Sequence, residues 1–175
     1  MSNKHPVLQF AKSPLYPSED IVIPEYKSEG AIAFDISSCV DMILKPCMEV
    51  TKTNALSGDM FAIGEFNKPY MVPTGLIPVI PKGYGIKIYL RSSIGVKTHL
   101  MLTNHVGLID EDYRGEIKLL LRNIGLFEFH IHVGDRICQG ELVSVPKPTI
   151  KEVDFYDVCN TARGDKGFGS TGMNK

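Results

Sequence analysis

Apolar and polar residues alternate with a period of two in parts of this chain, and such alternation predicts β-strands with one buried face. The strictest example is the segment from Phe127 to Val133, where Glu or His separates the apolar residues. A helix would need apolar residues every three or four positions to bury one face. Similar patterns predict further strands at three places, which are Ile86–Leu90, Ile117–Leu121 and Ile137–Val145.

The composition favours strands as well. Ile and Val together number 30, against 14 Leu and only 6 Ala. β-Branched side chains lose rotamer freedom in helices and fit a pleated sheet, whereas Ala and Leu favour helices. The one segment that predicts a helix is short, from Ser93 to His99, with Ser92 or Ser93 as its N-cap. We therefore predict an all-β fold, a distorted jelly roll or β-barrel with one short helix.

Length and charge narrow the class of protein. A chain of 175 residues has the length of one domain with a single hydrophobic core. Its formal net charge is -1, so it lacks the excess of basic residues expected of a protein that binds duplex nucleic acid. No apolar run approaches the ~20 residues of a membrane span, and the N-terminus lacks a signal-peptide pattern. The four cysteines form no C-x-x-C pair, so we expect neither disulfides nor structural zinc. These features predict a cytoplasmic protein with no membrane segment and no stable nucleic-acid complex.

Two stretches depart from the strand pattern. Residues 51–72 are polar and punctuated by glycine, which predicts a long surface loop or an extended hairpin. Residues 160–175 are rich in glycine and carry a single aromatic residue, which predicts a flexible tail. We therefore expect one β domain over residues 1–159, followed by the tail.

The tail carries groups that suit phosphate and a nucleobase. Residues 164–171 nearly match a Walker A loop, but Ser170 stands where the required Lys would be. Glycine N–H groups, the hydroxyls of Ser170 and Thr171 and the guanidinium of Arg163 could still bind phosphate. Phe168 could stack on a base. The alternative is a tail that binds nothing, and the tail alone does not decide between the two.

A second group of anion-binding residues lies at the predicted strand-to-helix junction. The Arg91 guanidinium can donate two parallel hydrogen bonds to an anion. Ser92 and Ser93 add hydroxyl groups near the N–H groups of the first helical turn. The alternative is an ordinary serine cap beside a solvated arginine.

Two aspartates lie between the glycines at positions 107 and 115. Asp110 and Asp112 are two residues apart, next to Tyr113, and the pattern predicts a tight hairpin in which one carboxylate could deprotonate a water. The alternative is an acidic turn in solvent.

His130 and His132 fall on the same face of a predicted strand, where they could share a metal. No third ligand stands at a supporting spacing, so a solvated strand face is the preferred interpretation.

Together these segments resemble the five sequence motifs of the trimeric dUTPases, in the family's order. The matching segments are Ala33–Ile36, Leu90–Ile94, Asn104–Gly115, Gly134–Gln139 and Arg163–Gly172. Each motif alone is weak, whereas five in order are strong evidence. The resemblance implies the family's jelly roll and its reaction, the hydrolysis of dUTP to dUMP and pyrophosphate. That reaction keeps uracil out of DNA and supplies dUMP for dTMP synthesis.

The resemblance also implies roles for individual residues. Asp110 corresponds to the carboxylate that activates the water attacking the α-phosphate, and Asp35 to the acid that holds the arginine of the second motif. Tyr113 corresponds to the aromatic ring under the deoxyribose, where a 2′-hydroxyl does not fit. The residues that correspond to the uracil-reading hairpin are Asn104, Gly107 and Leu108. The phosphate-side residues are Arg91, Ser92, Ser93, Lys118 and Gln139. In the family, the C-terminal tail closes over the bound nucleotide. The residues that correspond to this tail are Arg163, Phe168, Gly169, Ser170 and Thr171.

The family assembles and uses magnesium in a characteristic way. Its enzymes hold Mg²⁺ through the substrate phosphates and waters, so the resemblance implies magnesium without a direct protein ligand. It also implies a homotrimer with shared active sites, in which a neighbouring subunit donates the tail. The expected location is the cytoplasm, or the host cytoplasm for a viral protein.

The chain departs from the family pattern in several positions. Ala33 stands where Gly is usual, Ser93 also replaces Gly, and Asp165 and Lys166 replace the commoner Glu-Gly. The larger departure is the segment 51–72, which is roughly twenty residues longer than the usual turn. An insertion of this kind indicates a viral or phage member.

Two other functions stay open from the sequence. The chain could be a nucleotide-responsive regulatory module that uses residues 51–72 against a protein partner, with or without catalysis. A dCTP deaminase would share the fold, but it uses a glutamate base and lacks the Asp110 segment and the glycine-rich tail. We therefore expect dUTP hydrolysis.

Overall fold

Strands dominate the structure of this chain. The computed structural model describes residues 5–47, 52–53, 60–61, 68–158, 161 and 163–164. The strands are β1 (Gln9–Lys12), β2 (Phe34–Ser37), β3 (Met42–Leu44), β4 (Lys52–Thr53), β5 (Met60–Phe61), β6 (Tyr70–Pro73), β7 (Leu76–Val79), β8 (Tyr84–Leu90), β9 (Leu100–Leu102), β10 (Gly107–Ile109), β11 (Lys118–Asn123), β12 (Phe129–Ile131) and β13 (Arg136–Ser144). The described residues also form one α-helix, α1 (Ser92–Lys97), and two 3-10 helices, η1 (Ser18–Asp20) and η2 (Phe155–Asp157). The predicted all-β class with one short helix is confirmed.

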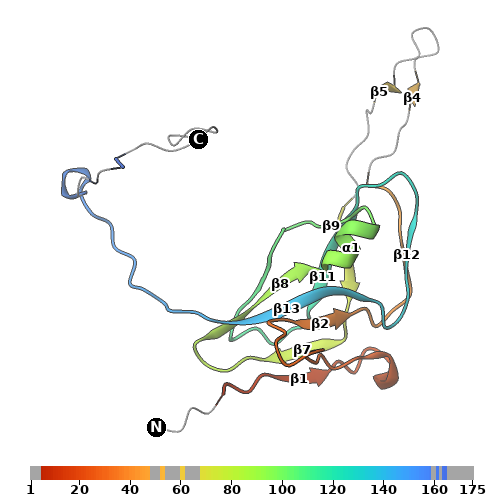
Figure 1. Ribbon diagram of the computed structural model, residues 1–175, viewed down its shortest axis with the longest axis horizontal. Helices are drawn as coiled ribbons and strands as arrows, with labels where there is room; N and C mark the ends of the chain where they lie inside the picture. The colour runs from red at the N-terminus through yellow and green to blue at the C-terminus, as the bar shows by residue number, and fades with distance from the viewer. Residues whose placement is uncertain are drawn as a thin grey trace. The chain divides into compact units, whose positions relative to one another are not determined.

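Two sheets carry most of the strands. One has the order β10-β8-β13-β2 and the other the order β6-β11-β9, while β1 pairs with β7, β12 with β3, and β4 with β5. All of these pairs are antiparallel. Figure 1 shows β13 running beside β8 and β2, with the helix α1 next to β9. Antiparallel sheets that share one core fit the jelly-roll type.

The core contains the apolar residues that the period-two pattern assigned to the inner faces of strands. In β8, Ile86 and Ile88 are at most 3% exposed, and in β11 Leu119 and Leu121 are at most 1% exposed. These residues belong to one buried cluster that also takes in β2, β6, β7 and β13. The strands predicted around these positions are therefore confirmed.

A glycine of β13 makes room for an aromatic ring in this core. Gly140 of β13 pairs with Phe34 of β2, and a Cβ at position 140 would lie 2.4 Å from the ring of Phe34. That ring also makes edge-to-face contacts with Phe10 and Tyr26. The missing side chain at position 140 thus provides the space in which Phe34 packs.

The helix differs from the prediction in its bounds and its cap. Helix α1 spans Ser92–Lys97 rather than 93–99, and its N-cap is Arg91, which makes no side-chain capping bond. The carbonyl of Arg91 accepts the N–H groups of Ile94 and Gly95, each at 3.0 Å. The helix therefore starts one residue earlier than a serine cap would allow, and the prediction that Ser92 or Ser93 caps it is wrong.

The strictest alternating segment is a shorter strand than predicted. Strand β12 covers only Phe129–Ile131, and Phe127 is 84% exposed. The reason is the buried Asn123, whose Nδ2 donates to the carbonyl of Phe127 at 2.7 Å and whose Oδ1 accepts the N–H of Gly125 at 2.9 Å. These bonds shape the chain before the strand into a turn.

The segment predicted as a loop or hairpin, residues 51–72, contains the antiparallel pair β4–β5, and that it forms an inserted loop or hairpin stays a prediction. The upper bound of 72 is wrong, because β6 starts at Tyr70 and pairs with β11. Val72 is fully buried, which explains why this part belongs to the core rather than to a surface loop.

The chain forms two compact units, Met1–Val145 and Pro146–Lys175. The core cluster lies in the first unit. The second contains η2, and the side chain of its N-cap residue Asp154 accepts the N–H of Tyr156 at 3.0 Å. The predicted division at residue 159 between domain and tail stays a prediction.

Cysteines 39, 47 and 138 are buried free thiols, and Cys159 lies outside the described residues. Burial raises the pKa of the Cys39 thiol to about 11 and that of the Cys138 thiol to about 12. Both thiols are therefore poor nucleophiles in the folded chain.

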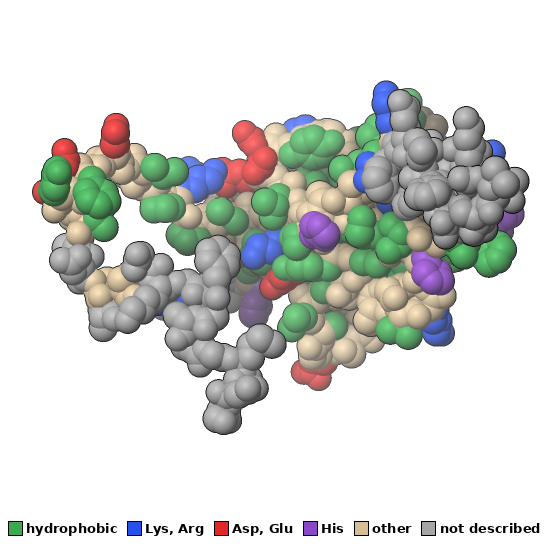
Figure 2. Space-filling model, turned by 90° about the horizontal axis from the view of Figure 1, so that it is seen from above, with side chains coloured by type: hydrophobic (Ala, Val, Ile, Leu, Met, Phe, Trp, Pro, Cys, Tyr) green, Lys and Arg blue, Asp and Glu red, His purple; other side chains and the backbone are tan. Residues whose placement is uncertain are grey.

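Apolar side chains also lie on the surface of the first unit, as Figure 2 shows for one face. Val96, Leu126 and Phe127 are each between 82% and 85% exposed. In the described part of the chain, no helix has the length and apolar character needed to cross a membrane.

Candidate functional site

One carboxylate organises the basic residues at the end of the larger sheet. Oδ1 of Asp35 lies 2.9 Å from Nε of Arg91, and Oδ2 of Asp35 accepts a hydrogen bond from Nη1 of Arg136 at 3.0 Å. The Asp35 side chain is 15% exposed and that of Arg91 23% exposed. A mostly buried carboxylate shared by two guanidinium groups fixes both and leaves a net positive cluster.

Strand pairing explains why residues distant in sequence meet here. Asp35 of β2 lies opposite Gln139 of β13, and Gln139 also lies opposite Tyr89 of β8. Arg91 follows β8 directly, where its backbone N–H donates to the carbonyl of Ile137 at 3.0 Å. The structure therefore brings together the first, second and fourth of the segments that resemble dUTPase motifs.

The two serines after Arg91 lie in the first turn of α1. Ser92 is exposed and Ser93 is half-buried. Nη1 of Arg91 donates to the carbonyl of Arg136 at 3.1 Å, so the guanidinium is held both by this carbonyl and by the Asp35 carboxylate. The hydroxyls and the guanidinium together can bind an anion such as phosphate.

The residues predicted to read the base lie in and after a turn between the sheets. His105 has a φ of +58°, and the N–H of Val106 donates to the carbonyl of Asn104 at 2.6 Å. Gly107 is buried against Ile88, and Leu108 is 70% exposed. The left-handed turn leaves the Asn104 side chain exposed to solvent.

The segment predicted as a tight acidic hairpin is instead a connection between two sheets. β10 pairs with β8, whereas β11 pairs with β6 and β9, so the two strands around Asp110 are not partners. Asp110 is exposed, and its carbonyl accepts the N–H of Tyr113 at 3.2 Å. Nη1 of Arg114 donates to the carbonyls of Glu111 and Tyr113, both at 2.8 Å. These bonds, rather than strand pairing, shape the segment.

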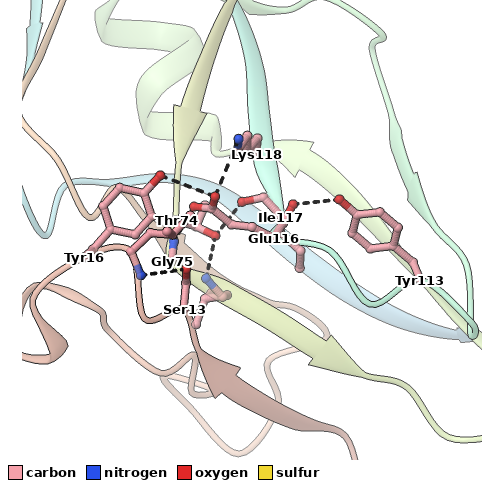
Figure 3. Close-up of polar contacts among 10 residues, drawn as sticks. Ser13, Tyr16, Thr74, Gly75, Tyr113, Glu116, Ile117 and Lys118 are labelled. Atoms are coloured by element: carbon pink, nitrogen blue, oxygen red, sulfur yellow. Dashed lines mark hydrogen bonds and ion pairs between the residues drawn. The ribbon is translucent and has the colours of Figure 1, made fainter.

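The ring of Tyr113 is fixed by its own loop. Its hydroxyl donates to the carbonyl of Glu116 at 2.9 Å, and the side chain is 41% exposed. A Cβ at Gly115 would lie 2.5 Å from that hydroxyl, so only glycine leaves room for the ring in this position. Figure 3 shows Tyr113 reaching back to Glu116 in this way.

Lys118, predicted on the phosphate side, begins β11. Its Nζ lies 3.7 Å from Oε2 of Glu116, whose side chain is only 8% exposed. Tyr16 donates to the same oxygen at 3.4 Å. Burial first and then the Glu116 charge raise the pKa of Tyr16, so it stays a neutral donor.

The positive cluster and Asp110 lie at opposite ends of β8. Ile109 pairs with Ile86, while Arg91 follows the far end of the same strand. At ~3.3 Å per residue, the backbone distance from position 86 to position 91 is roughly 17 Å. One chain therefore does not bring Arg91 and Asp110 to a common point.

A hollow of about 430 Å³ lies elsewhere on the unit. It is lined by residues 97–99 and 123–129, which include none of the predicted site residues.

The tail residues are only partly described. Arg163 is exposed, and Gly164 beside it has a φ of +57°. Four predicted residues lie outside the described part of the chain, namely Phe168, Gly169, Ser170 and Thr171.

Sequence reasoning missed three charged residues that the structure places in these groups: Arg136, Glu111 and Glu116. Arg136 stands inside the fourth motif-like segment, three residues before Gln139, so its position was a usable signal. The partners of Glu111 and Glu116 include backbone N–H groups far away in sequence, which no motif reveals.

His130 and His132 are both exposed on β12 or just after it, as predicted for a solvated strand face. Nδ1 of His132 lies 3.6 Å from Oδ1 of Asp41. In the described part of the chain, no three His, Cys, Asp or Glu side chains come close enough together to hold a metal ion.

Comparison with known proteins identifies the relatives of this chain. A family model described as dUTPase matches residues 56–172. A deoxyuridine 5'-triphosphate nucleotidohydrolase of Zymomonas mobilis is 39% identical over 154 residues, which cover 88% of this chain and 90% of that protein.

Two solved structures have a similar fold. A variant of the Staphylococcus bacteriophage 80alpha dUTPase, solved with dUpNHpp, has a TM-score of 0.75 at 23% identity and covers 95% of this chain and 99% of its own. A dUTPase variant from phage phi11 of S. aureus has a TM-score of 0.66 at 21% identity and covers 87% of this chain and 99% of its own. Its structure is described as revealing the coordination of a structural Mg(II) ion. At these identities the likeness shows the fold alone.

Proposed function

This chain belongs to the dUTPase family, and on that premise we propose that it hydrolyses dUTP to dUMP and pyrophosphate. The observation that carries the proposal is the pairing of Asp35 with Arg91 at 2.9 Å, because a guanidinium fixed before the substrate binds supports the phosphate contact that the family resemblance implies for Arg91. The reaction removes dUTP from the pool used for DNA synthesis and yields dUMP for dTMP synthesis. We assign it to the cytoplasm, or to the host cytoplasm if the protein is of phage origin.

Asp110 is the general base in this mechanism. Its exposed carboxylate takes a proton from a water, the water oxygen attacks the α-phosphorus, and the bond from the α-phosphorus to the bridging oxygen breaks. Pyrophosphate leaves with the bridging oxygen. Phosphoryl transfer needs little covalent help and much neutralisation of charge, which fits one carboxylate working with several cationic groups.

The phosphate side of the site is the cluster around Arg91. Arg91, with the hydroxyls of Ser92 and Ser93, binds the phosphate oxygens, and Gln139 and Lys118 add donors. Asp35 does not contact the substrate; it holds the Arg91 guanidinium in place. Backbone and side-chain donors fixed before the substrate arrives stabilise the charge that develops during the reaction.

Magnesium binds through the substrate in this proposal. When bound, Mg²⁺ neutralises the phosphate charge and orients the triphosphate. The phage phi11 structure, described with a structural Mg(II) ion, supports magnesium in the family.

Substrate selection rests on two features. Asn104 and the backbone of Gly107 and Leu108 read uracil by hydrogen bonds, and unpaired buried polar groups would penalise cytosine. The ring of Tyr113 lies under the deoxyribose and leaves no room for a 2′-hydroxyl. The bond from its hydroxyl to Glu116 supports this role because it fixes the ring.

We assign the active site to a homotrimer. Within one chain, Arg91 and Asp110 stand at opposite ends of β8, so a single α-phosphate cannot contact both. A second subunit that supplies Asp110 to the Arg91 cluster of the first resolves this separation. Exposed apolar side chains such as Val96 and Phe127 offer surface for subunit contacts. Residues 160–175 act as the tail that covers the nucleotide of a neighbouring subunit, with Arg163 and Phe168 as its main contacts.

The test is pyrophosphate release by the purified protein with Mg²⁺, with dUTP, dCTP, dTTP and UTP offered separately. Release from dUTP alone is the expected result. Deamination of dCTP would assign the chain to the deaminase, and binding of dUTP without turnover would favour the regulatory module. The comparisons favour neither of these alternatives.

A second test addresses the shared site. Arg91→Ala and Asp110→Asn each remove one half of it, so each variant alone is expected to be inactive. Co-expression of the two chains should restore part of the activity, because some sites then combine an intact Arg91 with an intact Asp110. Activity that stays absent in the co-expressed mixture, at normal trimer content, would contradict the shared site.

A further inference from the structure

The segment that joins β10 to β11 is anchored near its start by a glutamate. Oε2 of Glu111 accepts the backbone N–H of Gly83 at 2.7 Å. Gly83 has a φ of +81° in the turn between β7 and β8, which Tyr84 closes by donating to the carbonyl of Pro81 at 3.2 Å. The left-handed backbone, which glycine adopts without strain, places this N–H within reach of the carboxylate.

The same segment is anchored near its end by a second glutamate. Oε1 of Glu116 accepts the backbone N–H of Gly75 at 2.9 Å, while Oε2 is within 3.4 Å of the Tyr16 hydroxyl and 3.7 Å of Lys118 Nζ. Gly75 also has a positive φ, +68°, in the turn between β6 and β7. Figure 3 shows the Glu116 carboxylate between Tyr16, Gly75 and Lys118.

The two anchors lie at the two ends of one strand. Gly75 directly precedes β7, and Gly83 lies in the turn that follows it. The connecting segment therefore has its first and last parts bonded to backbone groups on either side of β7. Each bond is charge-assisted, because an ionised carboxylate accepts from an N–H group.

Each anchor is coupled to a different functional residue. Glu111 directly follows Asp110 in the chain, so the bond from its carboxylate to the Gly83 N–H restrains the backbone that carries the Asp110 carboxylate. Glu116 supplies the carbonyl that accepts the Tyr113 hydroxyl at 2.9 Å. Movement of the Glu116 backbone would therefore tilt the Tyr113 ring.

We propose that Glu111 and Glu116 are positioning residues with separate tasks, Glu111 for the base Asp110 and Glu116 for the sugar-selecting ring of Tyr113. This proposal rests on the roles that the proposed function gives to Asp110 and Tyr113. Neither glutamate touches the substrate; each acts through the residue that its bond holds in place. Catalytic rate and sugar selection are consequently separable by mutation.

The experiment compares four variants, Glu111→Ala, Glu111→Gln, Glu116→Ala and Glu116→Gln, with Glu29→Ala as a control at an exposed glutamate. Two quantities are measured for each. The first is kcat for dUTP per binding-competent site, counted by titration with a non-hydrolysable dUTP analogue. The second is the ratio of kcat/KM for dUTP to that for UTP. Neither quantity depends on how much of a preparation is folded.

Glu111→Ala should lower kcat roughly ten- to a hundredfold, as expected when a hydrogen bond to a charged group is lost, with the dUTP/UTP ratio unchanged. Glu116→Ala should lower the dUTP/UTP ratio by a similar factor, with a smaller effect on kcat. Each Gln variant keeps an acceptor oxygen for the glycine N–H and should recover most of the lost function. Glu29→Ala should match the unmodified chain.

The outcomes separate this proposal from the proposed function. If the unmodified chain does not hydrolyse dUTP, the proposed function fails. If it does, and Tyr113→Ala does not change the dUTP/UTP ratio, the assigned role of Tyr113 fails. The remaining case is that the unmodified chain hydrolyses dUTP and Tyr113→Ala changes the dUTP/UTP ratio. If Glu111→Ala and Glu116→Ala then both change kcat, both change the dUTP/UTP ratio, or change neither, the positioning roles are overturned.

Discussion

Asp35 holds Arg91 through Nε at 2.9 Å and at the same time accepts a hydrogen bond from Arg136 at 3.0 Å. The carboxylate is mostly buried between the two guanidinium groups, so both remain fixed without a bound anion. Removing one partner of such a pair leaves the other charges poorly compensated.

Asp35→Asn is expected to lower kcat/KM for dUTP roughly ten- to a hundredfold, because a neutral amide holds the guanidinium less firmly than a carboxylate does. Steady-state kinetics of pyrophosphate release measures the change. Asp157→Asn, at an exposed aspartate of η2, serves as the control. Equal kcat/KM values for Asp35→Asn and the unmodified chain would contradict the supporting role of Asp35.

Asp110→Asn is expected to abolish turnover while dUTP still binds. The amide cannot accept a proton from water at neutral pH, but it keeps the size of the side chain. Pyrophosphate release measures turnover, and calorimetric titration with dUTP measures binding. Unchanged turnover in this variant would remove Asp110 from the role of base.

The sequence predicted the strands of the core well, because burial of one face imposes alternation on the strand itself. Ile86 and Ile88 are buried as the pattern requires. The pattern failed around Phe127, where the side chain of Asn123 forms bonds that turn the chain. It also could not predict that β10 pairs with β8 rather than with β11, because alternation assigns faces and not partners.

The site was predictable to the extent that it lies within short motifs. Arg91 and Asp35 lie in motif-like segments, and their contact follows from the pairing of β13 with both β8 and β2. Glu111 and Glu116 were missed because their glycine partners lie 28 and 41 residues away. A bond to a distant backbone N–H depends on the fold and leaves no local pattern.

Gly140→Ala is expected to destabilise the fold by about 1–3 kcal/mol, the range for overpacking of a close-packed core. The added Cβ would lie 2.4 Å from the Phe34 ring, which is itself packed against Phe10 and Tyr26. Urea denaturation measures the free energy of unfolding. Gly30→Ala is the matched control, since nothing lies within 4 Å of its added Cβ. Equal losses in the two variants would show that the Phe34 contact has no special effect.

Removal of the residues after Asn160 is expected to abolish most dUTP turnover with little loss of stability. The whole buried core cluster lies in the unit Met1–Val145, so the truncation leaves the packing intact. The expected change in Tm is below about 2 °C, equivalent to less than about 1 kcal/mol for a chain of this size. A large drop in Tm would mean that residues 161–175 contribute to the fold and not only to the active site.

The buried thiol of Cys138 predicts a dependence of stability on alkaline pH. Burial raises its pKa from an ordinary 9.0 to about 12 in the folded chain, so the unfolded chain loses this proton at lower pH than the folded chain does. The stabilising contribution is therefore complete below pH 9 and is lost as the pH rises from 9 towards 12.

Cys138→Ala should lower the free energy of unfolding at pH 8, because it leaves a cavity, but should give a flatter dependence on pH above 9. Urea denaturation at pH 8, 9, 10 and 11 measures both effects. All other side chains are the same in the two proteins, so the difference between the two curves reports the Cys138 thiol. Parallel curves above pH 9 would show that the thiol ionises equally easily in the folded and unfolded chains.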